Sequence, residues 1–167
     1  MLLLIIIIII ITLFLKPLYV LEVRVDGTEK LVYQQQAKLG DTFDVYWIHS
    51  VTLQPVIETY EIQGFDRISL KKMVFDDNGP NLPAYPEAGQ EWKIENGKFI
   101  ISGYDRIFTR VPVTIGAVIS NHILIYKGKN IRLKESYRPG GFVHIGLARK
   151  SVLEFLLKEY EIWRKKN

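Results

Sequence analysis

Two side chains that could do acid–base chemistry, His49 and Glu58, interrupt an otherwise apolar and aromatic stretch, YWIHSVTLQPVIETYEI. Strand alternation places His49 on the face of Trp47 and Glu58 on the face of Tyr60. If the two strands form a hairpin, both polar groups reach one apolar face, where an unpaired carboxylate is costly. Three interpretations follow: a His–Glu pair that fastens two strands, a pair that binds a ligand or metal, and a general base.

The sequence contains only a weak candidate set for a metal site. His49, Glu58 and His122 would form a site of two histidines and one carboxylate, but no closely spaced H-E-x-x-H motif is present. We therefore expect no metal and no cofactor. The chain has no cysteine, which excludes disulfides, thiolate metal sites and a cysteine nucleophile.

Other catalytic and binding classes are also disfavoured. Ser50 directly follows His49, but adjacent strand residues point to opposite faces and no G-x-S-x-G motif is present, which argues against a serine hydrolase. The RPGG segment is a turn and not a phosphate-binding loop. The net charge is +4, and the basic residues are scattered along the 167 residues. We therefore expect no nucleic-acid partner.

The chain begins with an apolar run in which Thr12 is the only polar residue among positions 1–15. The heptamer Ile5–Ile11 would be prone to aggregation outside a membrane. A cleaved signal peptide has a basic flank before its apolar region and small residues at its cleavage site, and both are missing here. For residues 1–16 we favour an uncleaved signal anchor over a cleaved signal peptide, with residues 1–15 in the membrane.

After Pro17 the pattern changes to short alternating apolar runs, which indicate β-strands. Asn96-Gly97, between EWKIE and KFIIS, is the clearest hairpin signal in the chain. We count about ten short strands, with turns roughly every 8–12 residues. This spacing predicts an all-β domain over residues 17–146, built as an antiparallel β-sandwich or a partly open barrel.

Two segments depart from the strand pattern. Residues 76–90 hold three prolines and two glycines, which predicts a long irregular loop of the kind that often carries function. Residues 147–167 predict a C-terminal amphipathic helix, with Ser151 as its N-cap and apolar side chains at helical spacing after it. This helix either packs on the sheet or lies on a membrane surface, and we favour packing on the sheet.

Several of these segments resemble one family. The stretch from Ile48 to Tyr60, with IHSV, PV and ETY, resembles the signature of a bacterial and archaeal family, the domain of unknown function "eighteen-fifty". NHILIYKGKNIRLKE resembles a later hairpin of the family, with His122 at the matching histidine, and RPGGFVHI resembles its final strand. The resemblance extends over roughly residues 18–145.

The resemblance also marks individual residues. In the loop, where the family carries a Gly-rich segment, Gly79, Leu82 and Pro83 match, and Asn81 stands in place of a second glycine. The family's recurring histidine, proline and glutamate imply that His49, Pro55 and Glu58 belong to a shared feature. The residues that we expect to support this feature are Ser50, Pro55, Tyr60 and His122.

The resemblance implies more about location than about chemistry. Genes of the family often stand near TRAP transporters of the TAXI type, and its members commonly begin with a hydrophobic segment. The expected role is an accessory or binding domain, anchored in the cell membrane and facing the periplasm or cell exterior, with the transporter's permease or solute-binding protein as partner.

No activity is implied by the family, and the lack of a catalytic motif favours a protein that is not an enzyme. Two alternatives remain open. One is an extracytoplasmic hydrolase that uses a metal or His/Glu acid–base chemistry, and the other is a structural protein of the cell envelope.

Overall fold

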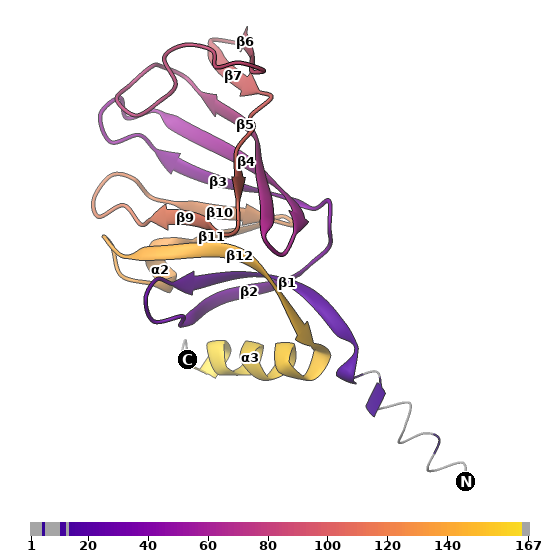
Figure 1. Ribbon diagram of the computed structural model, residues 1–167. Helices are drawn as coiled ribbons and strands as arrows, with labels where there is room; N and C mark the ends of the chain where they lie inside the picture. The colour runs from indigo at the N-terminus through magenta and orange to yellow at the C-terminus, as the bar shows by residue number, and fades with distance from the viewer. Residues whose placement is uncertain (1–4, 6–10, 13, 165–167) are drawn as a thin grey trace.

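The computed structural model describes residues 5, 11–12 and 14–164, which form two antiparallel β-sheets and a C-terminal helix (Figure 1). Sheet 1 has the strand order β2-β1-β12-β9. Its strands are β1 (Pro17–Val25), β2 (Leu31–Ala37), β9 (Val111–Thr114) and β12 (Phe142–Ser151). The predicted antiparallel β-fold with a C-terminal helix is confirmed.

Sheet 2 has the strand order β11-β10-β3-β4-β5-β7-β6, and β8 pairs with β5 beside this path. Its strands are β3 (Thr42–Ile48), β4 (Pro55–Gly64), β5 (Arg67–Phe75), β6 (Glu91–Glu95), β7 (Lys98–Ser102), β8 (Ile107–Phe108), β10 (Ile123–Tyr126) and β11 (Lys129–Arg132). The helices are α2 (Leu133–Ser136) and α3 (Val152–Arg164). The described residues thus form twelve strands, and within them neither sheet closes into a barrel.

The two sheets share one hydrophobic core. Strand alternation supplies it, because every second residue of β12 from Val143 to Ile145 is buried while Phe142 is exposed. Leu21 of sheet 1 and Phe43 of sheet 2 belong to the same buried cluster. A second, smaller cluster lies under β4, β5 and β7 and comprises Val56, Met73, Phe75, Leu82 and Ile101.

The first and last strands pair along their whole length. The register of β1 and β12 runs from Pro17 opposite Ser151 to Val25 opposite Val143. The boundary that we placed at residue 147 falls inside β12, because residues 147–151 continue the ladder with β1. The helix begins at Val152, since Ser151 caps it.

The cap of α3 is reciprocal. The hydroxyl of Ser151 accepts a hydrogen bond from the backbone N–H of Glu154 at 3.2 Å. The Glu154 carboxylate in turn accepts the backbone N–H of Ser151 at 2.7 Å. This S-x-x-E arrangement is a capping box, so the prediction of Ser151 as the N-cap is confirmed.

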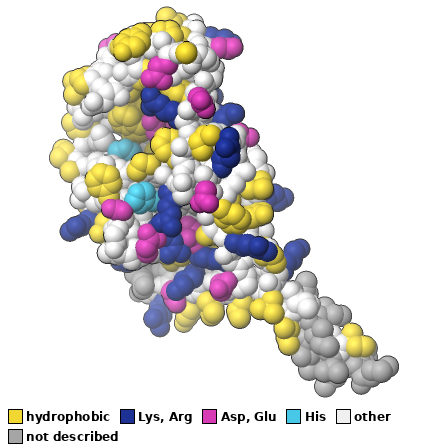
Figure 2. Space-filling model, viewed as in Figure 1, with side chains coloured by type: hydrophobic (Ala, Val, Ile, Leu, Met, Phe, Trp, Pro, Cys, Tyr) yellow, Lys and Arg dark blue, Asp and Glu magenta, His cyan; other side chains and the backbone are white. Residues whose placement is uncertain are grey.

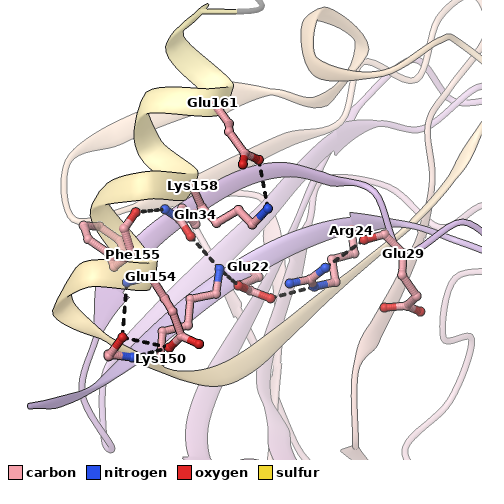
Figure 3. A network of polar contacts seen from close by, with 10 residues as sticks. Glu22, Arg24, Glu29, Gln34, Lys150, Glu154, Phe155, Lys158 and Glu161 are labelled. Atoms are coloured by element: carbon pink, nitrogen blue, oxygen red, sulfur yellow. Dashed lines mark hydrogen bonds and ion pairs between the residues drawn. The ribbon is translucent and has the colours of Figure 1, made fainter. Parts of the chain in front are cut away.

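A buried polar network on sheet 1 joins the sheet to α3 (Figure 3). Glu22, which is 4% exposed, forms ion pairs with Lys150 and, at 2.6 Å, with Arg24. Lys150 also donates to the side chain of Gln34 at 2.7 Å, and Gln34 donates to the carbonyl of Phe155 in α3 at 2.8 Å. The Glu22 carboxylate thus binds two cations, and one of them, Lys150, connects it through Gln34 to the helix.

The predicted signal anchor over residues 1–16 falls mainly outside the described residues. In the part of the chain that the structure describes, no helix has the length and apolar character needed to cross a membrane.

The buried network makes the first testable prediction. Replacement Glu22→Gln keeps the side-chain volume but leaves the Lys150 ammonium buried without its carboxylate. We expect the free energy of unfolding to fall by about 3–5 kcal/mol, measured by urea denaturation.

The matched control is Glu29→Gln, because Glu29 pairs with Arg110 at the surface, with side chains 58% and 47% exposed. This variant should lose only about 0–1 kcal/mol. Equal losses in the two variants would contradict a structural role for Glu22.

Candidate functional site

The hairpin of β3 and β4 forms one wall of the candidate site. Its register places Val45 opposite Glu58. The pairing of β4 with β5 shifts between Thr59 and Tyr60, and such bulges re-aim nearby side chains. The hydroxyl of Tyr60 donates a hydrogen bond to the Glu58 carboxylate at 2.9 Å, as their shared strand face allows.

His49 is buried, with 4% of its surface exposed, and both of its ring nitrogens are engaged. Nε2 lies 2.8 Å from the carbonyl oxygen of Pro80. Because a carbonyl oxygen only accepts, Nε2 carries the hydrogen, and Nδ1 accepts the backbone N–H of Thr52 at 3.1 Å. The neutral imidazole therefore fastens the turn over residues 49–54 to the loop over residues 76–90.

The predicted contact between His49 and Glu58 is not formed. Among the described residues, no hydrogen bond or ion pair joins the two side chains, and each has other partners. The strand argument failed because β3 ends at Ile48. His49 lies in the turn beyond it, where alternation no longer dictates which way a side chain points.

The loop packs closely against the His49 ring. A methyl group at Gly79 would lie 2.8 Å from His49 Cε1 and 2.9 Å from Thr52 Cγ2, so only glycine fits there. Asn81 has a φ of 66°, in the left-handed region that favours glycine and that asparagine tolerates. This accounts for an asparagine where the resemblance expects a second glycine.

Glu58 is a largely buried carboxyl group with an altered acidity. Burial raises its pKa, while the Tyr60 hydrogen bond and the positive charge of Arg106 act in the opposite direction. Burial, the proximity of the Glu58 charge and the hydrogen bond raise the pKa of Tyr60. Because burial dominates at Glu58, its protonated form is favoured relative to an exposed glutamate.

Tyr104 and Arg106 complete this polar cluster. Burial raises the pKa of Tyr104 to about 12, against the effect of the Arg106 charge. The Arg106 guanidinium lies 5.8 Å from the centre of the Tyr104 ring and donates to Glu87 at 3.2 Å. Within the described residues, the buried Tyr104 hydroxyl has no hydrogen-bond partner.

A cleft of about 640 Å³ opens between β3 and β4 on one side and β9 with its following loop on the other. The aromatic rings of Trp47 and His122 stack on its wall, 5.8 Å apart at an angle of 18°. The lining residues are Val45, Trp47, Ser50, Glu58, Asn81, Pro112, Val113, Thr114, Gly116, Ser120 and His122. Of the residues predicted from sequence, Glu58, Ser50 and His122 therefore share one cleft.

His122 reaches the cleft from the position directly before β10. Its Nδ1 accepts the backbone N–H of Gly116 at 3.3 Å. Burial lowers the pKa of His122, partly opposed by a hydrogen bond to the backbone of Ser120. The neutral ring is therefore favoured, which suits a stacking and hydrogen-bonding surface better than a fixed cation.

A side pocket of about 400 Å³ adjoins the cleft, because Glu58 and Asn81 line both cavities. The loop predicted to be functional forms part of it through Leu82 and Pro83. Leu82 also packs in the second core cluster, which ties the loop to the sheet. Pro55 lies apart from both cavities as the first residue of β4.

Among the residues that the structure describes, neither a metal site nor a serine–histidine pair is assembled. The described residues contain no group of three or more His, Cys, Asp or Glu side chains that could hold a metal. In the candidate set of His49, Glu58 and His122, both nitrogens of His49 are already bound to Pro80 and Thr52. For the same reason His49 is not available as a base for Ser50.

Sequence reasoning missed several members of the site. Tyr104 and Arg106 follow strand β7 in SGYDR, which has no recognisable motif. Gly116 had a usable signal, because a glycine after a strand often marks a close backbone approach. A methyl group there would lie 1.7 Å from the carbonyl oxygen of Ser120, so the loop of the cleft requires glycine.

Another cavity, of about 250 Å³, lies on sheet 1 beside the Glu22 network. Its charged walls are already neutralised, since Arg24 pairs with Glu22 and Arg110 pairs with Glu29 at 3.0 Å. The cleft beside Glu58 is therefore the better candidate for a ligand site.

A comparison with known families matches a domain of unknown function (DUF1850) to residues 43–133. No curated protein and no solved structure matches the chain. The matched range lies inside the range 18–145 of the sequence resemblance. It contains all the residues that line the cleft and the side pocket, whereas β1, β2, β12 and α3 lie outside it.

The close packing at Gly79 can be tested by Gly79→Ala. The added methyl group must displace the His49 ring. We therefore expect the free energy of unfolding to fall by about 1–3 kcal/mol. Urea denaturation measures the loss, and the NMR signals of the His49 imidazole report the displacement.

Gly64→Ala is the control, since its methyl group would meet its nearest neighbour, Arg67 Cβ, at an ordinary 3.6 Å. Neither Gly64 nor Gly79 has a positive φ. The control should change stability by less than about 1 kcal/mol. A Gly79→Ala protein as stable as the control, with unchanged His49 signals, would argue against close packing of the loop on the His49 ring.

The raised pKa of Glu58 predicts a pH dependence of stability. Between the ordinary pKa of glutamate and the raised pKa in the fold, the folded state binds more protons than the unfolded state. Wild type should therefore lose stability relative to Glu58→Gln as the pH rises through the raised pKa. Urea denaturation at a series of pH values measures this difference.

Glu61→Gln, on the same strand, should behave with the opposite sign. Hydrogen bonds from Gln63 and Lys71 lower the pKa of Glu61, so wild type gains stability relative to this variant as the pH rises. A stability difference between wild type and Glu58→Gln that does not change with pH would refute the raised pKa of Glu58.

Proposed function

This chain belongs to the family described as a domain of unknown function (DUF1850), and from that premise we propose that it is a membrane-anchored extracytoplasmic binding domain. In this proposal it takes up a small polar ligand in the cleft and works as an accessory of a TRAP transporter of the TAXI type. The membrane anchor and the transporter come from the sequence and the family resemblance. The ligand site comes from the geometry of the cleft.

The observation that carries the binding role is the cleft itself. Its volume of about 640 Å³ lies within the range of about 300–1,000 Å³ that is usual for small-molecule sites. The stacked rings of Trp47 and His122 offer a flat apolar wall, and Glu58 and Asn81 offer polar groups. An apolar wall with few polar groups is the usual composition of such sites.

Two exposed apolar tips near the cleft support an accessory role beside a larger protein. Val118 is 90% exposed, and in the turn after β3 Val51 and Leu53 are 65% and 60% exposed. The hydroxyl of Ser120 donates to the carbonyl of Ile48 at 2.8 Å, which joins the two segments. Exposed apolar tips held by a rigid scaffold are suited to contact with a protein partner.

A hydrolase is the second candidate, and the raised pKa of Glu58 is the observation that favours it. A carboxyl group with a raised pKa at a cleft can act as a general acid or base. His49 cannot share this role, because both of its nitrogens are bound within the fold. The structural role of His49 also fits the third candidate, a structural envelope protein.

The binding role predicts the effect of filling the cleft. Thr114 is exposed on β9 and lines the cleft, so Thr114→Arg should block it without disturbing the core. We expect the tagged variant, purified from native membranes, to lose a small molecule that wild type retains. Mass spectrometry of the material released on denaturation measures this loss.

Thr42→Arg is the matched control, because Thr42 is an exposed threonine at the start of β3 and outside both cavities. The control should retain the molecule. The same pull-downs should contain a transporter permease or solute-binding protein. Repeated recovery of the tagged protein with no transporter subunit and no released molecule would contradict the proposal. Turnover of a substrate by wild type that Glu58→Gln abolishes would favour the hydrolase.

A further inference from the structure

Helix α3 displays a continuous apolar stripe to solvent. Its members stand at positions i, i+3, i+4, i+7 and i+10, so they lie on one side of the helix. They are Leu153, Leu156, Leu157, Tyr160 and Trp163, which are 44%, 48%, 54%, 57% and 60% exposed. The partly buried residues Val152, Phe155 and Ile162 lie on another side of the helix, against sheet 1.

The orientation of α3 is fixed by its contacts with the sheet. Gln34 on β2 holds the carbonyl of Phe155, and Lys150 holds Gln34 (Figure 3). The capping box at Ser151 fixes the beginning of the helix. The helix packs on sheet 1, as we favoured, but five of its apolar side chains are not covered by the sheet. The structure leaves them turned outward.

The charges of α3 are arranged around this stripe. At 100° per residue, Glu154, Glu159 and Glu161 all fall outside the arc that the five apolar residues span. Arg164 lies at the C-terminal end of the stripe and is followed in sequence by two lysines. Absence of acidic residues from the stripe and a basic C-terminal end suit an anionic lipid surface.

The beginning of the chain supplies a second apolar surface at the same corner of the molecule. The backbone N–H of Val152 donates to the carbonyl of Lys16 at 3.2 Å. Just before Lys16, Ile11, Phe14 and Leu15 are 51%, 41% and 61% exposed. Figure 2 shows hydrophobic side chains along the lower edge of the molecule, where Figure 1 places α3.

We propose that α3 lies in the headgroup region of the lipid bilayer, with its apolar stripe inserted. This inference rests on the membrane attachment proposed above. The stacked rings of Tyr160 and Trp163, 6.0 Å apart, are of the type that prefers the membrane–water interface. The sheet–helix contacts would then set sheet 1 over the membrane. The β6–β7 hairpin, at the opposite end of the molecule in Figure 1, would point away from it.

The absence of cysteine from the chain makes the test direct, because each introduced cysteine is unique. The full chain carries Leu157→Cys in the stripe or Glu159→Cys, which lies two residues further and nearly opposite on the helix. Each is labelled with a polarity-sensitive fluorophore and reconstituted into phosphatidylcholine–phosphatidylglycerol vesicles. Quenching is then compared between nitroxide-labelled lipids and aqueous iodide.

We expect the Leu157→Cys label to be quenched severalfold more strongly by the lipid nitroxide than the Glu159→Cys label, and iodide to show the reverse order. Leu15→Cys, labelled in the same way, reports the N-terminal segment separately. Lipid quenching at position 157 with none at position 15 would support the inference while contradicting the anchor.

Two results would overturn the inference. One is a label at position 157 that iodide reaches freely while the label at position 15 is quenched by lipid, which would leave the anchor intact. The other is a label at position 157 shielded from both quenchers in proportion to protein density, since a second copy of the chain would then cover the stripe. Unfolding curves of the labelled proteins confirm that the fold is retained.

Discussion

The candidate site depends on the two hydrogen bonds that the neutral imidazole of His49 makes to Pro80 and Thr52. The imidazole joins a turn and a loop whose contacting residues are 31 positions apart in the sequence. His49 itself lines neither cavity, but the Pro80 carbonyl that it holds directly precedes Asn81, which lines both. Protonation of Nδ1 would remove the acceptor for the Thr52 N–H. The histidine therefore shapes the site through its hydrogen bonds and not through chemistry of its own.

The regular parts of the fold could be predicted because they follow from local periodicity. The β6–β7 hairpin is confirmed, since Asn96 and Gly97 both take the positive φ that a tight hairpin turn needs. The contact between His49 and Pro80 could not be predicted, because it depends on the path of an irregular loop. The extension of β12 to residue 151 was missed for a related reason: only the long-range pairing with β1 keeps residues 147–151 extended.

The two proposed roles of the molecule fall in separate regions. The family match over residues 43–133 contains sheet 2 except Thr42, together with β9 and the cleft. The rest of sheet 1 and α3 lie outside this region, and the β1–β12 ladder brings the start of β1 beside the start of α3 at one corner. The buried Glu22–Lys150 pair secures this corner. The proposed ligand site in the matched region and the proposed attachment surfaces at the chain ends thus share no residues.

The burial of Glu58 bears both on stability and on the proposed ligand binding. Its ionised form is disfavoured by burial, and neither the Tyr60 hydrogen bond nor the Arg106 charge fully offsets that cost. Unlike Glu22, it has no cation in direct contact within the described residues. A ligand that placed a cation or a hydrogen-bond donor at the junction of the cleft and the side pocket would favour the ionised form. Such a ligand would be bound more tightly as Glu58 deprotonates, so binding and proton release would be coupled.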